Sequence, residues 1–193
     1  MEENFDKTRE SVTEYIHLAK DVSGISLIKK LKKVLSKDST VLEIGSGLGT
    51  DWTILSELFR TTGSDNSPEL LKHLIQTNPT GEFLELDASS LKTERTFDAI
   101  YSNKVLHHLK DDELHQSIQR QSEILNSKGV ICHSFWNGEG SEVFKGLFVN
   151  YHNKEHLTEN FESKFKILLF IEYQEFEPND SIFLIARKKG IFI

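Results

Sequence analysis

The chain has 193 residues, of which 37% are hydrophobic and 27% charged, which suits one globular domain with a sizeable core. Its net charge of −7 disfavours nucleic acid as a partner, because like charges repel. The single cysteine excludes an intrachain disulfide, and no apolar stretch approaches the roughly 20 residues that a membrane helix needs. The polar N-terminus does not resemble a secretory signal, so we expect a cytoplasmic protein, as a monomer or homodimer.

Short apolar runs alternate with amphipathic segments, a pattern typical of a sheet with helices on both faces. In chain order, two helices are expected around residues 12–19 and 27–35, each with one apolar stripe. Strands are then predicted over residues 40–44, 60–64, 82–86, 97–102, 129–135, 166–173 and 181–186. Further helices are predicted over residues 52–58, after the N-cap Ser67, at Asp111 and after Asn153. Pro178 lies in the short turn between the last two strands, which should therefore pair as an antiparallel hairpin. We predict one α/β domain over residues 1–193, with residues 1–37 as N-terminal cap helices and residues 38–193 as the core.

Polar or glycine-rich sites follow three successive predicted strands, at the edge where open α/β sheets bind ligands. The first is the segment 43–49, Glu-Ile-Gly-Ser-Gly-Leu-Gly, whose glycines allow sharp turns and a close approach of ligand to backbone. The second is Asp65, whose carboxylate can accept two hydrogen bonds from a ribose diol. The third is Asp87 with Ala88, where a carboxylate and a backbone N–H could pair with an adenine edge.

Two cofactor classes compete for this loop: a nicotinamide or flavin dinucleotide, and S-adenosylmethionine. Asp65 does not decide between them, because the dinucleotide fingerprint also expects an acidic residue about 20 residues after its first glycine. That fingerprint has a small residue where Thr50 stands, and Gly49 comes one place too early for it. Glu43 would repel a pyrophosphate and attract an ammonium. The loop therefore favours S-adenosylmethionine, as does the terminal hairpin.

Four stretches, in order, resemble a known family: VLEIGSGLG at residues 41–49, GSDNSPELL at 63–71, LDA at 86–88 and FDAIYSNKVLHHL at 97–109. With these motifs the chain resembles the class I, Rossmann-like S-adenosylmethionine-dependent methyltransferases, in their small-molecule branch. The resemblance extends from about residue 40 to the final strand. It implies a three-layer Rossmann-like sandwich, with a seven-stranded, mostly parallel sheet whose last strand is antiparallel. The implied partner is a small-molecule acceptor, and no metal is expected.

The resemblance also implies roles for individual residues. Glu43 and the loop backbone would hold the methionine end of the cofactor, Asp65 the ribose, and Asp87 with Ala88 the adenine. Ser102 and Asn103 would line the sulfonium and the acceptor channel. The full set of expected cofactor-binding residues is Glu43, Gly45, Ser46, Gly47, Gly49, Asp65, Asn66, Asp87, Ala88, Ser102 and Asn103.

The sequence departs from the family pattern in two places. Asn66 stands where a bulky apolar residue commonly packs on the adenine ring. Ser127-Lys128-Gly129 replaces the usual Pro-Gly-Gly turn before the fifth strand. The first change weakens the expected stacking on adenine, and the second is a turn substitution without an evident chemical consequence.

The candidate catalytic residues are His107, His108 and Tyr151, with His152 as a further candidate. The two histidines at 107 and 108 follow the fourth strand at the active-site edge, where one could deprotonate or orient the acceptor. The competing interpretation is that these side chains only pack or cap locally. A base is needed only if the acceptor carries a proton that must leave.

Three further features have structural interpretations that we favour. Cys132 lies inside a predicted strand, so a buried thiol is expected rather than a nucleophile. The segment 152–156, His-Asn-Lys-Glu-His, matches a short zinc-protease pattern, but the remaining chain offers little for a third ligand. Aromatic residues in two segments could form a lid over a planar acceptor or could simply pack; they are Phe5, Tyr15, Trp136, Phe144, Phe148 and Tyr151.

From these patterns we expect transfer of the methyl group of S-adenosylmethionine to a small acceptor. One rival is an adenosyl-binding regulatory module without catalysis, which Asn66 mildly favours. A less favoured rival is a nicotinamide-dependent oxidoreductase, which Thr50 and Glu43 disfavour.

Overall fold

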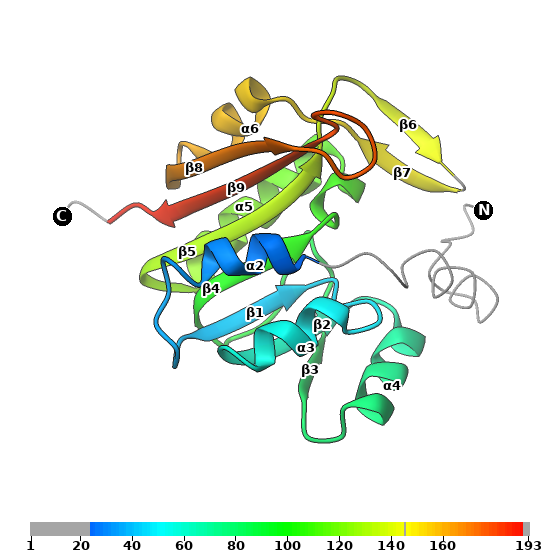
Figure 1. The fold of residues 1–193 in the computed structure, drawn as a ribbon, viewed down its shortest axis with the longest axis vertical. Helices are drawn as coiled ribbons and strands as arrows, with labels where there is room; N and C mark the ends of the chain where they lie inside the picture. Colours follow the sequence, from blue (N-terminus) through cyan, green and yellow to red (C-terminus); the bar gives the residue numbers. More distant parts are fainter. Residues whose placement is uncertain (1–23, 145, 191–193) are drawn as a thin grey trace.

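The computed structural model describes residues 24–144 and 146–190, and in this part of the chain a seven-stranded sheet forms the centre of the fold (Figure 1). The strand order is β3-β2-β1-β4-β5-β9-β8. Its strands are β1 (Thr40–Ile44), β2 (Arg60–Asp65), β3 (Glu82–Glu85), β4 (Phe97–Asn103), β5 (Leu125–Trp136), β8 (Phe165–Tyr173) and β9 (Ser181–Lys188). The first five strands are parallel, whereas β9 is antiparallel to both β5 and β8. The predicted sheet, its antiparallel last strand and its final hairpin are therefore confirmed.

Side chains of the central strands alternate between two hydrophobic clusters, one on each face of the sheet. On β1, Leu42 belongs to the cluster that contains residues of α5 (Asp111–Ile124) and α6 (Lys154–Phe161). The adjacent Val41 belongs to the cluster that contains residues of α2 (Ile25–Leu31) and α3 (Thr50–Ser56). Because successive side chains of a strand point to opposite faces, β1, β4, β5 and β9 each contribute to both clusters. Figure 1 shows α2 and α3 on the near face and α5 on the far face, which gives the three layers.

Local signals set the starts of several helices. Ser67 caps α4 (Pro68–Thr77) by accepting a hydrogen bond from the Leu70 N–H, and proline occupies the first helical position. Asn153 caps α6 in the same way, through the His156 N–H at 2.8 Å. Acidic residues fill the first turn of α5, where they suit the positive end of the helix dipole. These predicted starts are confirmed.

The structure differs from the predictions in several of the described segments. α2 ends at Leu31, although Val34 and Leu35 still pack on the core beside it. β5 begins at Leu125, four residues before the expected Gly129. A 3-10 turn, η2 (Leu106–His108), follows β4 where no element was predicted. The helix expected over residues 12–19 lies outside the described residues, as do Phe5 and Tyr15 of the proposed aromatic lid.

A second, unpredicted hairpin consists of β6 (Ser141–Phe144) and β7 (Leu147–Asn150), which pair antiparallel. All four residues of β6 are exposed, so the alternation of apolar and polar residues that marks a half-buried strand is absent there. Figure 1 shows that the hairpin projects at the carboxyl end of β5, the end of the sheet at which the candidate site lies. In the described part of the chain, no helix is long and apolar enough to cross a membrane.

Candidate active site

The glycine loop after β1 has the backbone geometry that its sequence predicts. Gly45, Gly47 and Gly49 all have positive φ, at 69°, 51° and 82°, a region that side chains other than glycine rarely adopt. A Cβ on Gly45 would also lie 2.6 Å from a methyl carbon of Val105, which leaves no room for one. The loop thus turns sharply into α3 and keeps its backbone accessible on the side of the sheet's carboxyl edge.

Glu43 lies at the base of this loop and is almost completely buried. The Ser46 hydroxyl donates a hydrogen bond of 2.6 Å to its carboxylate. The pKa of Glu43 is raised to about 8, mainly by burial, with the Ser46 hydrogen bond opposing the rise and the nearby charges of Asp51 and Asp65 adding to it. Gly63 faces Glu43 on β2, and a Cβ there would come within 2.7 Å of the Ser46 hydroxyl, so this glycine leaves space for the pair. Nothing in the amino-acid sequence indicated this role of Gly63.

Asp65, at the end of β2, is buried and connects two loops. Its carboxylate accepts hydrogen bonds of 3.0 Å from the Gly47 N–H and of 3.0 Å from the Ser67 N–H. The residue therefore fixes the glycine loop against the start of α4. A carboxylate has about four lone-pair sites, so these bonds are compatible with the expected contact to ribose hydroxyls.

Asp87 and Ala88 follow β3 in a tight turn. One carboxylate oxygen of Asp87 accepts bonds from the Ser89 N–H at 2.9 Å and the Ser90 N–H at 3.1 Å, and from the Ser89 hydroxyl. Burial raises the pKa of Asp87, but these hydrogen bonds outweigh it, so the net pKa is lowered and the side chain is ionised at neutral pH.

A cavity of about 420 Å³ joins these three strand ends. It is lined by Ile44, Gly45, Gly47, Asp65, Asn66, Leu70, Leu86, Asp87, Ala88, Lys104, Val105, His108, Leu109, Glu113, Gly146, Leu147 and Phe148. The cavity thus brings together six of the predicted cofactor-binding residues, Gly45, Gly47, Asp65, Asn66, Asp87 and Ala88, whereas its lining does not include the other five, Glu43, Ser46, Gly49, Ser102 and Asn103. Leu70, Leu86 and Leu109 supply apolar surface near Asn66, which the sequence had not indicated.

The β6–β7 hairpin covers one side of this cavity. Gly146, Leu147 and Phe148 contribute to its wall, and His108 Nδ1 lies 2.7 Å from the Phe148 carbonyl oxygen. A carbonyl oxygen only accepts, so His108 Nδ1 donates the hydrogen of this bond. Phe148 is therefore the member of the predicted aromatic lid that lines the cavity.

Ser102 and Asn103 have partners away from the cavity lining. The Ser102 side chain is fully buried and bonds at 2.8 Å to Nδ1 of His133, on the neighbouring strand. Asn103 donates to Asp51 at 3.0 Å and accepts from the Ser134 hydroxyl. The structure thus places both residues at the end of β4 with their side chains engaged in the sheet and in α3, and their proposed role at the sulfonium stays a prediction.

Asp51 was not singled out from the sequence, yet its carboxylate accepts three hydrogen bonds at this edge. It is buried in the first turn of α3 and accepts bonds from the Gly24 N–H at 2.6 Å, the Tyr101 hydroxyl at 2.7 Å and Asn103. An acidic residue in a first turn ordinarily indicates only a favourable helix dipole, so nothing in the sequence revealed its burial.

Lys104 is another residue that sequence reasoning missed. Its ammonium donates to the Phe135 carbonyl at 2.9 Å and the Ser181 hydroxyl at 2.7 Å, and lies 3.4 Å from the centre of the Trp136 ring. Burial lowers the pKa of Lys104 to about 8, and the nearby carboxylate of Glu175 opposes this shift. Lys104 thus holds the β8–β9 turn against the end of β4.

The candidate catalytic residues lie in different environments. His108 lines the cavity, whereas His107 is buried behind it, and its Nδ1 makes no hydrogen bond with the described residues. Burial lowers the pKa of His107 well below its usual range. The Tyr151 hydroxyl donates to Glu142 of the hairpin at 2.5 Å, which raises the pKa of Tyr151. Tyr151 is not among the residues that line the cavity.

The structure bears on two alternatives from the sequence, a nucleophilic Cys132 and a zinc site at residues 152–156. Cys132 is fully buried within β5, and burial raises the pKa of its thiol. His152 and His156 stack, with their Nδ1 atoms 3.2 Å apart, and among the described residues no group of three or more potential metal ligands surrounds them.

The fold and the site define the class of the protein: a Rossmann-like α/β domain with a ligand cavity at the carboxyl ends of its parallel strands. A family model described as a methyltransferase domain matches residues 41–129. A curated relative, trans-aconitate 2-methyltransferase of an Enterobacter species, is 36% identical over 76 residues, which cover 38% of this chain and 30% of that protein. The chain thus matches less than a third of the length of this relative.

Two solved structures with a similar fold are more distant in sequence. A TehB-like S-adenosylmethionine-dependent methyltransferase of Corynebacterium glutamicum has a TM-score of 0.77 at 17% identity, over 94% of this chain and 100% of the other. The 1,6-didemethyltoxoflavin-N1-methyltransferase of Burkholderia thailandensis, solved with S-adenosylhomocysteine, has a TM-score of 0.74 at 20% identity, over 94% and 87%. The chain is thus similar in fold to S-adenosylmethionine-dependent methyltransferases, and its residues 41–129 match a methyltransferase domain model.

Proposed function

We propose that the chain binds S-adenosylmethionine in the cavity of about 420 Å³ and transfers its methyl group to a small-molecule acceptor. The observation that carries the proposal is the buried carboxyl of Glu43 beside a glycine loop with positive φ angles. A buried acid without a cationic partner is costly, and the ammonium of the cofactor's methionine end would supply that partner. A dinucleotide would instead bring a pyrophosphate toward the three acids Glu43, Asp51 and Asp65.

The other residues fit an adenosine group. Asp65 would accept from the ribose hydroxyls while holding the loop through the Gly47 N–H. Asp87 and Ala88 would face the adenine edge, and Leu86 and Leu109 would contact its ring in place of the apolar residue that Asn66 replaces. When bound, the sulfonium supplies an activated methyl group, so the chain has mainly to align the acceptor and exclude water.

His108 is the candidate that we favour for contact with the acceptor, ahead of His107 and Tyr151. Because its Nδ1 donates to the Phe148 carbonyl, the lone pair of the neutral imidazole is on Nε2. His108 also lines the cavity, whereas the other two do not. It would receive a proton from an acceptor hydroxyl or amine, and an acceptor without such a proton would not need it.

The remaining features of the proposed protein come from the sequence. We propose that residues 38–193 form the catalytic core and residues 1–37 its N-terminal cap, in a cytoplasmic monomer or homodimer without nucleic acid as a partner. The named relatives suggest an acceptor panel of polycarboxylic acids and planar nitrogen heterocycles, because one relative is named for trans-aconitate and another for didemethyltoxoflavin.

Calorimetry with S-adenosylhomocysteine and NADH tests the proposal. We expect saturable binding of S-adenosylhomocysteine, and Asp65→Ala should weaken it by about 1.5–3 kcal/mol, the scale of hydrogen bonds to a charged group. Asp38→Ala, which removes an exposed carboxylate remote from the cavity, serves as the control. Binding of NADH without S-adenosylhomocysteine would refute the cofactor, and tight cofactor binding without turnover on any acceptor would favour a regulatory module.

A further inference from the structure

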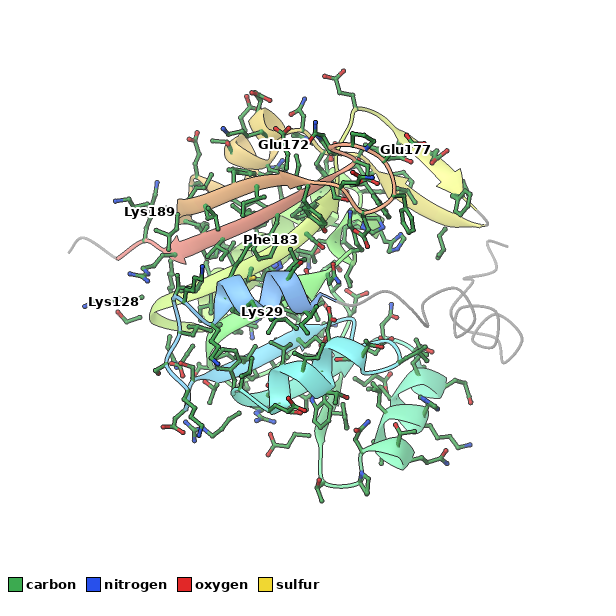
Figure 2. All side chains as sticks on the ribbon, viewed as in Figure 1. Lys29, Lys128, Glu172, Glu177, Phe183 and Lys189 are labelled. Atoms are coloured by element: carbon green, nitrogen blue, oxygen red, sulfur yellow. The ribbon has the colours of Figure 1, made fainter. Side chains whose placement is uncertain are left out.

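A second cavity, of about 310 Å³, lies at the opposite edge of the sheet from the cofactor cavity. Its walls come from the segment before β1, the start of β4, the turn within the start of β5 and the end of the antiparallel β9. All of these meet at the amino ends of the parallel strands. Figure 2 shows Lys128 and Lys189 at this edge, far from the β6–β7 hairpin that covers the cofactor cavity.

Arg187 lines this cavity and is the first of two unusual groups in it. On β9 it follows Phe183 and Ile185 at alternate positions, so its side chain lies on the face that α2 covers. Its Nε is buried without a hydrogen bond, and among the described residues its guanidinium makes no hydrogen bond or ion pair. A guanidinium that is partly removed from water and lacks an anionic partner is unfavourable, so an anion in this cavity would gain a favourable contact with Arg187.

Lys128 is the second unusual group of the cavity. It has a φ of 64°, a left-handed conformation that glycine adopts readily and other residues adopt at a cost. The family pattern has glycine in this turn, so the lysine replaces a residue that adopts this backbone conformation at a lower cost in free energy. Its side chain is exposed and has no ion pair among residues 24–144 and 146–190. Non-glycine residues in such conformations concentrate at functional sites.

The rest of the cavity lining includes hydroxyl donors beside the apolar side chains of Val34, Leu35 and Val130. Ser36 and Ser39 lie with their hydroxyl oxygens 3.0 Å apart, and Ser127 adjoins Lys128. Two carboxylates also line the cavity. Asp98 uses both of its oxygens to accept from Thr40 and Asn126, whereas Asp38 is exposed. The two cations are therefore not neutralised by direct contact with these acids.

We propose that Arg187 and Lys128 bind a phosphate group in this cavity, either as inorganic phosphate or as the phosphate of a small metabolite. The planar guanidinium can donate two parallel hydrogen bonds to phosphate oxygens, and the lysine supplies a second positive charge. The serine hydroxyls can donate to the remaining oxygens. This site is independent of methyl transfer, because no residue of it lines the cofactor cavity.

Titration of the native chain with inorganic phosphate, and separately with glycerol phosphate, tests the proposal by calorimetry at constant ionic strength. We expect saturable binding of at least one of them, weakened about tenfold or more by Arg187→Gln. Lys128→Gly should weaken the binding about two- to fivefold, the scale of an exposed ion pair. The melting temperature without phosphate should not fall for Lys128→Gly, since glycine suits a positive φ.

The control variant is Lys29→Gln, which removes one positive charge from the exposed surface of α2 outside the cavity (Figure 2). It should bind phosphate as the native chain does. The proposal is overturned if neither phosphate compound saturates, or if Arg187→Gln and Lys128→Gly both bind with native affinity. It is also overturned if S-adenosylhomocysteine competes with phosphate, since the phosphate would then occupy the cofactor cavity.

Discussion

Binding of S-adenosylhomocysteine should release a proton from Glu43, and this proton can be counted. Burial raises the pKa of Glu43 to about 8, so without ligand the carboxyl is mostly protonated at pH 7. A carboxyl with this pKa carries about 0.9 of a proton at pH 7. If the ligand's ammonium pairs with the carboxylate, that proton must leave when the complex forms.

The same linkage sets the pH dependence of the affinity. Protonation of Glu43 in the unliganded chain multiplies the dissociation constant of S-adenosylhomocysteine by one plus the ratio of protonated to ionised Glu43. This dissociation constant should therefore fall about ninefold between pH 6 and pH 7. This window is suitable because an α-amino group, with a pKa of about 8, is still protonated there. Above pH 8 the ligand's own amine loses its proton, and the gain in affinity should end.

Isothermal titration calorimetry in two buffers with different ionisation enthalpies measures the number of protons released. We expect about 0.9 at pH 7 for the native chain and close to none for Glu43→Gln. The glutamine variant keeps an acceptor for the ammonium but cannot ionise, so its affinity should also be nearly flat from pH 6 to pH 7. Proton release that persists in Glu43→Gln, or a native chain that releases none, would refute the placement of the ammonium beside this carboxyl.

Three further predictions concern the unliganded chain. From pH 7 to pH 8 the free energy of unfolding should fall by about 1 kcal/mol, because the folded state still holds the Glu43 proton that the unfolded state has lost near pH 4.5. Urea titrations at the two pH values measure this change in the free energy of unfolding. The same change in a Glu43→Gln chain would contradict the assignment of the effect to Glu43. Asp51→Ala should lower the free energy of unfolding by about 3 kcal/mol, since three donors, two of them buried, lose their acceptor. A loss below about 1 kcal/mol would show that these hydrogen bonds contribute little to the stability of the fold. His108→Phe removes the bond to the Phe148 carbonyl, worth about 1 kcal/mol, and should speed hydrogen exchange over residues 147–150 about fivefold. The control is Tyr151→Phe, which removes only the hydrogen bond between Tyr151 and Glu142. Equal rates of hydrogen exchange over residues 147–150 in the two variants would show that the His108 bond does not stabilise the hairpin.

Much of the fold could be predicted because its signals are local. The boundaries of β1 follow from a short apolar run, and the helix starts after Ser67 and Asn153 follow from side chains that cap their own backbone. The β6–β7 hairpin escaped prediction because β6 is exposed along its whole length, so no burial pattern was present in the sequence.

The candidate site divides in the same way. The carboxyl ends of parallel strands meet at one edge, so the sequence alone was enough to bring the glycine loop, Asp65 and Asp87 to one cavity. The direction of each side chain depended on its partners. Ser102 bonds to His133 on the neighbouring strand, and Asp51 bonds to Gly24 and to residues of β4.

The sequence by itself determined the order of the elements, the turn at the glycine loop and the set of acids at the sheet edge. Only the tertiary structure decided which of these groups are buried, which face the cavity and which bond elsewhere. The physical reason is that backbone conformation and capping depend on residues a few positions apart. Burial, pKa shifts and unpaired groups such as the Arg187 Nε depend instead on contacts between segments far apart in the chain.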